Sequence, residues 1–226
     1  MEEIIRQSFV RATERMSAWA DLLDRINVFP VADADTGRNL ILSLRPLRNL
    51  DGNPDRTARQ LLFSARGNSG NIAARFFSEF IKTLSLSDIP SAADSARKAA
   101  YQAVSAPKAG TMLSVFDTFA DTVPEISLKD SPEPLVIPLS DTVRSTAETL
   151  PELRESGVVD AGALGMFLFL ETFFCTLSNA PEKMLSPCER FPGKLKISAA
   201  FHRKESGHCI NALIRTAEED AENAKI

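Results

Sequence analysis

Two carboxylates spaced two residues apart, Asp33 and Asp35, are the side chains of this chain best suited to bind a metal ion. They follow an apolar stretch that cannot be helical at Pro30, because proline lacks an amide donor and restricts the residues before it to extended geometry. Directly after them, Thr36-Gly37-Arg38-Asn39 leads into apolar residues at helical spacing. Mg²⁺ prefers one or two carboxylates with water and substrate phosphates, and the free amides of a helix start attract those phosphates. The segment favours a magnesium site beside a phosphate site, although an acid-rich turn with Thr36 as N-cap accounts for it equally well when taken alone.

Three further segments combine glycine with polar residues at expected helix junctions. They are Arg66-Gly67-Asn68-Ser69-Gly70, Lys108-Ala109-Gly110-Thr111-Met112 and Gly157-Val158-Val159-Asp160-Ala161-Gly162-Ala163-Leu164-Gly165. Glycine lets the backbone approach a ligand closely, and Ser69 is suited to cap the helix that follows. Each segment alone is a weak signal, because short glycine motifs are frequent by chance. Simple alternatives exist for two of them: a helix cap for Asn68 and Ser69 or a structural ion pair for Arg66 in the first, and an Asx-turn acid for Asp160 in the third.

Composition is that of an ordinary soluble chain with one sizeable core. The 226 residues are 44% apolar and 25% charged, and the net charge of −4 without any Lys/Arg run argues against nucleic acid as the main partner. No apolar stretch reaches the ~18–20 residues of a membrane span, and Met-Glu-Glu at the start is no signal peptide. Three widely spaced cysteines form neither a disulfide framework nor a clear zinc pattern, which favours a reducing cytoplasm.

Apolar periodicity predicts an all-α fold. Apolar residues three and four apart from Ile5 to Ile26 predict a long first helix. The last helix, from Gly162 to about Leu177, is apolar on every side and should be the most buried element. Further helices are expected at about 36–48, 54–65, 69–84, 90–106, 111–123 and 133–149, which makes about eight in total.

The order of these helices places the four polar segments together. If successive helices run antiparallel, loops separated by two helices fall at the same end of the bundle. Two helices separate each polar segment from the next one along the chain. A single nucleotide at that end is therefore expected to reach all four segments.

The four segments in this order resemble the nucleotide-binding L-subunit family of dihydroxyacetone kinases. Within that family, the chain is most similar to the N-terminal ATP-binding domain of the fatty acid kinase subunit that works with DegV-type fatty-acid-binding proteins. The resemblance runs from about Ile4 to about Leu177. It implies an eight-helix antiparallel barrel with ATP or ADP and Mg²⁺ at one mouth.

The resemblance also implies roles for the site residues. Asp33 and Asp35 would hold the Mg²⁺ that bridges the nucleotide phosphates, and Asn27 is the candidate third ligand, with Asp24 as a spare acid. The phosphates would contact Thr36, Gly37, Asn39, Asn68 and Ser69. The base and ribose would lie beside Gly110, Thr111, Asp160 and Gly162.

The sequence changes character after about residue 180. Prolines in 181–192 mark a linker, after which Lys194–Phe201 alternates like a strand and His208–Ile214 is its candidate partner. Two strands alone are marginal in water. We therefore expect residues 1–180 to form the helical domain, and 193–226 to begin a second, β-containing domain that continues beyond this chain.

Three functions remain open at this point. The first is the ATP-dependent phosphotransferase part of a fatty acid kinase, acting on a carboxylate held by a DegV-type partner. The second is a dihydroxyacetone (glycerone) kinase L-type subunit, and the third is a non-catalytic regulatory nucleotide-binding module. Both histidines lie in the tail, so the helical part has no imidazole for an acceptor site. The acceptor is expected to come from elsewhere, and the sequence leaves a homodimer open.

Overall fold

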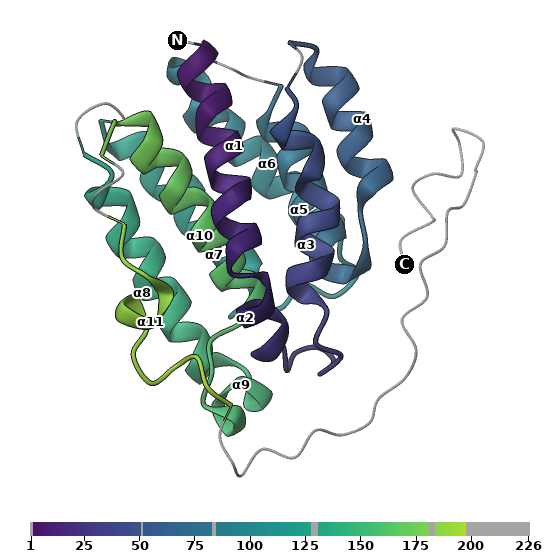
Figure 1. Cartoon of the computed structure of the whole chain (residues 1–226), viewed down its shortest axis with the longest axis vertical. Coiled ribbons are helices and arrows are strands. Elements are labelled where there is room, and N and C mark those ends of the chain that lie inside the picture. The colour runs from purple at the N-terminus through teal and green to yellow at the C-terminus, as the bar shows by residue number, and fades with distance from the viewer. Residues whose placement is uncertain (1, 51, 83–84, 128–130, 181–183, 198–226) are drawn as a thin grey trace.

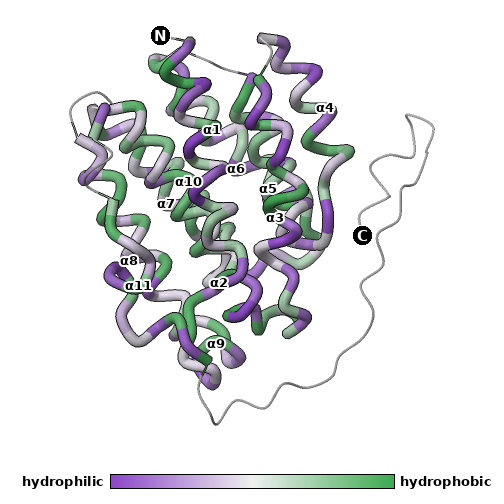
Figure 2. The backbone as a smooth tube through the Cα atoms, viewed as in Figure 1, coloured by the Kyte–Doolittle hydropathy of each residue, from purple (hydrophilic) through white to green (hydrophobic). Residues whose placement is uncertain are grey.

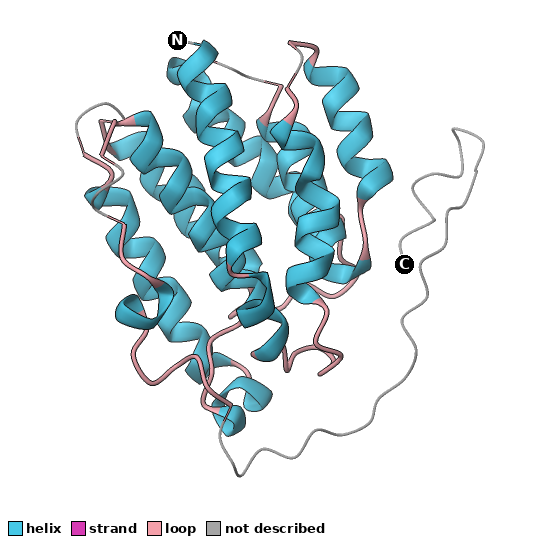
Figure 3. Ribbon diagram, viewed as in Figure 1, coloured by secondary structure: helices cyan, strands magenta, loops and turns pink. Residues whose placement is uncertain are grey.

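The computed structural model describes the chain except for residues 1, 51, 83–84, 128–130, 181–183 and 198–226. The described part is an antiparallel helical bundle without any strand, which confirms the predicted all-α fold (Figures 1 and 3). Eight of its helices are nine residues or longer: α1 (Glu2–Ala18), α3 (Thr36–Leu44), α4 (Pro54–Ser64), α5 (Gly67–Phe80), α6 (Ile89–Gln102), α7 (Met112–Thr122), α8 (Glu133–Thr149) and α10 (Ala161–Leu177). The shorter elements are α2 (Ala20–Arg25), α9 (Pro151–Ser156), α11 (Pro187–Arg190) and the 3₁₀ turns Arg45–Arg48, Leu86–Asp88 and Val123–Glu125.

Helix α10 lies at the centre of the bundle, as its sequence predicts. Every residue from Ala161 to Thr176 is buried, and the helix contacts α1, α2, α3, α7 and α8. The other helices alternate hydrophobic and hydrophilic residues around this core (Figure 2). Phenylalanines fill the centre, where the ring of Phe9 on α1 lies 4.8 Å from that of Phe173 on α10. No helix in the described ranges combines the length and the apolar character that crossing a bilayer requires.

Two of the expected helices are interrupted. The first breaks at Trp19, whose φ of −107° and ψ of 9° leave the helical region, so that α2 turns away from α1. The second ends its α-helical part at Leu44 and continues as a 3₁₀ turn that contains Pro46. Proline supplies no amide donor, which explains the change of helix type.

The segment after α10 packs back onto the bundle. Helix α11 lies within the predicted linker, and Phe191 directly after it is buried. The described part of the expected strand, Lys194–Ile197, forms bends instead, which corrects the strand prediction there. One backbone hydrogen bond, from the Val159 amide to the Lys194 carbonyl (3.1 Å), joins it to the segment before α10, and a strand needs a ladder of such bonds. The expected partner His208–Ile214 lies outside the described residues, and the domain boundary near 180 stays a prediction.

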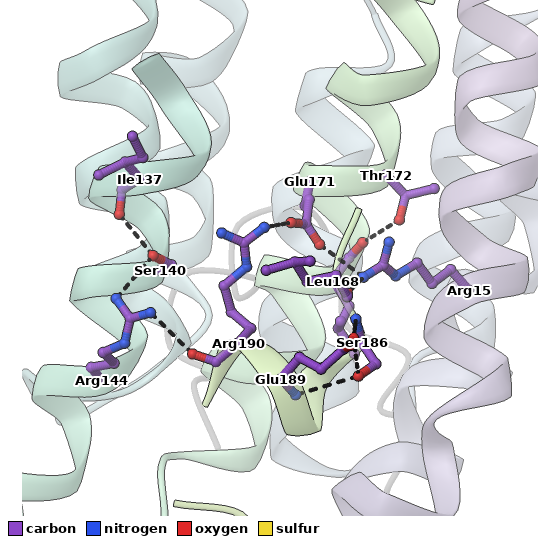
Figure 4. A network of polar contacts seen from close by, with 11 residues as sticks. Arg15, Ile137, Ser140, Arg144, Leu168, Glu171, Thr172, Ser186, Glu189 and Arg190 are labelled. Atoms are coloured by element: carbon purple, nitrogen blue, oxygen red, sulfur yellow. Dashed lines mark hydrogen bonds and ion pairs between the residues drawn. The ribbon is translucent and has the colours of Figure 1, made fainter. Parts of the chain in front are cut away.

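A buried carboxylate ties this returning segment to the core. The side chain of Glu171 on α10 is fully buried and forms ion pairs with Arg15 of α1 (2.9 Å) and Arg190 of α11 (2.6 Å), which approach it from opposite sides (Figure 4). Arg15 also donates to the Leu185 carbonyl at 2.6 Å. Three segments that are distant in sequence are therefore joined at one buried charge.

Replacing Glu171 by Ala should lower the free energy of unfolding by about 3 kcal/mol or more, because two largely buried arginines lose their counter-charge. The matched control is Glu148→Ala, which removes an exposed ion pair with Lys194 (3.1 Å). That control should cost less than about 1 kcal/mol. Urea unfolding of both variants measures the difference, and equal losses would contradict the structural role given to Glu171.

Candidate functional site

A cavity of about 430 Å³ opens where α3, α5, α7 and α10 begin. All four polar segments contribute to its wall, as the antiparallel order of the helices predicts. Four helix N-termini, each with the positive end of a helix dipole, therefore converge on one volume. The predicted site residues that line it are Asn27, Asp33, Asp35, Thr36, Asn39, Asn68, Ser69, Thr111, Asp160 and Gly162.

Asp24 leaves the carboxylate of Asp35 free by capping α3 in its place. Asp35 occupies the N-cap position of α3, yet its side chain makes no capping hydrogen bond. The carboxylate of Asp24, on α2, instead accepts from the amides of Gly37 (2.7 Å) and Arg38 (3.2 Å). Asp24 is therefore a structural cap of α3, and it does not line the cavity. The simple alternative with Thr36 as N-cap is also excluded, because Thr36 is the first residue of the helix.

Asp33, Asp35 and Asn27 form a cluster of oxygen atoms suited to a hard cation. Desolvation of the carboxylate, as the larger cause, and the negative charge of Asp35, as the second, raise the pKa of Asp33 above its usual value. Asn27, which is 2% exposed, donates from Nδ2 to Asp33 Oδ1 at 2.7 Å, and its own Oδ1 is buried without a hydrogen-bond partner among the described residues. A divalent cation would relieve the repulsion of the carboxylates and satisfy this oxygen.

The described residues contain no cluster of three or more His, Cys, Asp or Glu side chains that could hold a metal. A magnesium site needs none, because one or two carboxylates, waters and substrate phosphates complete its octahedron. Asn27, Asp33 and Asp35 therefore fit Mg²⁺ with a bound nucleotide better than a metal bound by protein alone.

The first turn of α5 faces the cavity, which Gly67, Asn68 and Ser69 line. This helix begins at Gly67, so Ser69 is its third residue and does not cap it, contrary to the expectation from sequence. The N-cap residue is Arg66, whose side chain makes no capping bond and whose amide donates to Ser43 Oγ at 2.9 Å. Anions bind at helix starts of this kind, where Asn68 and Ser69 add polar side chains.

Two predicted contact residues, Gly37 and Gly110, do not line the cavity. A Cβ at Gly37 would overlap the carbonyl of Ala20, so glycine is required there for α3 to pack closely on α2. Gly110 has a φ of +78°, and its amide donates to Ser114 Oγ at 2.9 Å. The structure gives both glycines a packing or turn role.

The opposite wall is built around Asp160. This residue caps α10 by accepting from the Ala163 amide at 2.7 Å, and it also accepts from the Met112 amide at the start of α7. Burial raises its pKa to about 7, although these amides act in the opposite direction. Thr111 caps α7 by accepting from the Leu113 amide at 3.3 Å. Asp160 therefore holds two helix starts in register beside the cavity.

Sequence reasoning missed several lining residues. Lys108 is the one cationic side chain among the described residues that line the cavity, and it stands in the third polar segment without having been assigned a role. The rest of the wall is apolar and includes Phe29, Ile72, Val104, Met112 and Leu113. Their contribution depends on how the helices pack, which no local pattern predicts.

Comparison with known proteins agrees with this arrangement. A family model described as the DAK2 domain matches residues 30–175. The chain is 30% identical over 241 residues to Protein YloV of Bacillus subtilis, covering 92% of this chain and 43% of that protein. It is 33% identical over 227 residues to an uncharacterized protein of Mycoplasma genitalium, MG369, covering 86% of this chain and 40% of that protein. The chain thus spans about two fifths of the length of these relatives.

The raised pKa of Asp160 should make the free energy of unfolding depend on pH. A folded-state pKa near 7 against about 4 in the unfolded chain means that folding takes up a proton between these values. The free energy of unfolding should therefore fall as pH rises from 4 to 7, with a slope approaching about 1.4 kcal/mol per pH unit from this group. Asp160→Asn keeps the cap and should flatten that slope.

Urea unfolding at pH 5, 6, 7 and 8 measures this effect. The exposed Asp21→Asn on α2 serves as the matched control and should leave the slope of the wild-type protein unchanged. An unchanged slope in Asp160→Asn would contradict the raised pKa.

Proposed function

Because the chain belongs to the DAK2 domain family, we propose that it binds Mg·ATP in the cavity and supplies the γ-phosphoryl group to a fatty acid carboxylate presented by a DegV-type partner. The observation that carries this proposal is the cluster of Asn27, Asp33 and Asp35 beside four converging helix N-termini. Phosphoryl transfer asks a protein for positioning and charge neutralisation and for little covalent chemistry. A cluster of metal ligands next to anion-binding amides meets both demands.

In this proposal, one side of the cavity contacts the metal and the phosphates of the nucleotide, and the other side contacts its base and ribose. Asp33 and Asp35, with Asn27 as the third ligand, would hold Mg²⁺, which neutralises phosphate charge when bound. The positive dipole ends of α3 and α5, with the hydroxyls of Thr36 and Ser69, would hold the phosphate oxygens, and Lys108 adds a positive charge. The apolar wall with Ile72 and Val104, next to Thr111 and Asp160, suits a flat base and its ribose.

The lack of histidine in the described helices supports a carboxylate acceptor. Both histidines of the chain, His202 and His208, lie outside the described residues, so no imidazole lines the cavity in the part of the chain that the structure describes. An alcohol must lose a proton when it attacks phosphorus, whereas a carboxylic acid with a pKa near 4–5 is already ionised at neutral pH. A fatty acid therefore fits these residues better than dihydroxyacetone does.

Replacing either metal-site acid should abolish magnesium-dependent nucleotide binding. In Asp33→Asn and Asp35→Asn, calorimetry should find the Kd for Mg·ADP raised by at least about 100-fold, equivalent to ~2.7 kcal/mol. The exposed Asp21→Asn is the control for loss of one negative charge and should bind as the wild type does. An unchanged Kd for Mg·ADP in both acid variants would contradict the proposed magnesium site.

Nucleotide should also stabilise the chain by linkage. At about 100 times its Kd, one bound ligand adds ~2.7 kcal/mol, which raises the Tm by a few degrees for a domain of this size. The increase should require both ADP and Mg²⁺ and should vanish in Asp35→Asn. If no combination of ATP, ADP and Mg²⁺ shifts the Tm, the fold is a non-binding structural module.

The decisive experiment separates the acceptor classes. The chain is incubated with Mg·ATP and either free oleate, an oleate-loaded DegV-type protein, or dihydroxyacetone. Acyl phosphate is expected only with the loaded protein, because transfer requires the attacking oxygen to be held within about 3–3.5 Å of phosphorus. Phosphorylation of dihydroxyacetone instead, or rapid turnover of free oleate, would overturn the proposed division of labour.

A further inference from the structure

Exposed apolar side chains gather on α3 and α4. Among the described residues, five large apolar side chains are exposed, and three of them lie on these two helices. They are Leu42 on α3, and Leu62 and Phe63 on α4, of which Phe63 is 69% exposed. Single exposed apolar residues are normal on a protein surface, but a cluster that includes a phenylalanine indicates an interaction site.

Arginines surround these apolar residues. Residues 36–66 contain six arginines and two aspartates, although the whole chain has a net charge of −4. Arg38, Arg45 and Arg59 are exposed and form no ion pair with any described residue. Helical spacing puts Arg38, Leu42 and Arg45 on one stripe of α3 and its 3₁₀ extension, and Arg59, Leu62 and Phe63 on one face of α4. Aromatic residues and arginine are the residue types enriched at protein interfaces.

This surface adjoins the entrance of the cavity. Helices α3 and α4 contact each other and run antiparallel, so the start of α3 and the end of α4 lie at the same end of the bundle (Figure 1). Phe63 is four residues before Gly67, which lines the cavity. The guanidinium of Arg66 bends back to the carbonyls of Phe63 (3.2 Å) and Ala65 (2.7 Å), which joins the end of α4 to the start of α5.

We propose that the outer face of α3 and α4 docks the acceptor-presenting protein, through a surface on that partner with carboxylates around an apolar depression that receives Phe63. The inference rests on the proposed function. Charge complementarity selects this occupant, because unpaired arginines around an apolar centre attract an acidic surface and steer its approach. A second copy of the chain is disfavoured, since a two-fold contact through this face would bring arginine against arginine. A lipid surface would not hold a single carboxylate in line with the phosphorus, as the transfer requires.

Steady-state kinetics with increasing concentrations of the oleate-loaded DegV-type protein tests the apolar centre. Phe63→Ser should raise the KM for the loaded protein by about tenfold or more and leave the Kd for Mg·ADP unchanged. The matched control is Ile137→Ser on α8, which removes another exposed apolar side chain (55% exposed) on a different side of the bundle (Figure 1). That control should leave both constants unchanged.

Charge reversal tests the arginines. The double variant Arg45→Glu with Arg59→Glu should raise the same KM and remove its increase with ionic strength, because the attraction that salt screens has been lost. Arg11→Glu, an exposed arginine on α1, is the control and should keep the salt dependence of the wild type. If Phe63→Ser and the arginine variant both keep the wild-type KM, the docking surface is wrong.

Two further measurements separate this proposal from its rivals. The Kd for the loaded partner, measured without ATP, reports docking even if the wild-type chain transfers no phosphoryl group. The proposed reaction can therefore be wrong while the proposed docking surface is right. A wild-type chain that does not bind the partner would overturn the surface. So would a loss of binding to phosphatidylglycerol vesicles in Phe63→Ser at unchanged KM, which would assign the face to a membrane.

Discussion

The burial of α10 is the constraint on which the rest of the structure depends. A helix that is apolar on every side must be covered on every side, and here the helices α1, α2, α3, α7 and α8 cover it. Gly165 allows close packing on this side, because a Cβ there would press against Leu40 of α3 and Leu23 of α2. Once antiparallel helices surround α10, the starts of α3, α5, α7 and α10 come to one end of the bundle, and the site follows from that geometry.

The same end of the bundle concentrates opposing charges. The positive ends of the helix dipoles favour an anion, while Asp33 and Asp35 favour a cation. Asp24 makes the two compatible, because it caps α3 from α2 and releases Asp35 from that task. Desolvation, and then the negative charge of Asp35, raise the pKa of Asp33. In the proposed function, a metal-bound phosphate would relieve the repulsion between these two carboxylates.

Sequence reasoning succeeded where a local pattern carries the physical cause. The all-apolar α10 and the two-helix spacing of the polar segments predict the core and the shared end of the bundle. It failed where distant residues decide the local structure. The turn at Trp19 and the cap from Asp24 depend on how α2 meets α3, and the alternation at Lys194–Ile197 gives no strand because no described segment pairs with it. Helix α11 was overlooked although its capping box, Ser186 with Glu189, is readable in the sequence.

Three faces of helix α3 have different surroundings: the cavity, the core and the solvent. Its first turn lines the cavity with Thr36 and Asn39, its inner face packs Leu40 against Gly165 of α10, and its outer face carries Arg38 and Leu42. The helix is nine residues long, so its outer face lies within about two turns of the proposed phosphate site. A partner bound to that face would therefore need no moving lid to bring its acceptor to the proposed site. Because the outer side chains make no contact with the cavity, they are free to vary with the partner while the nucleotide site stays the same.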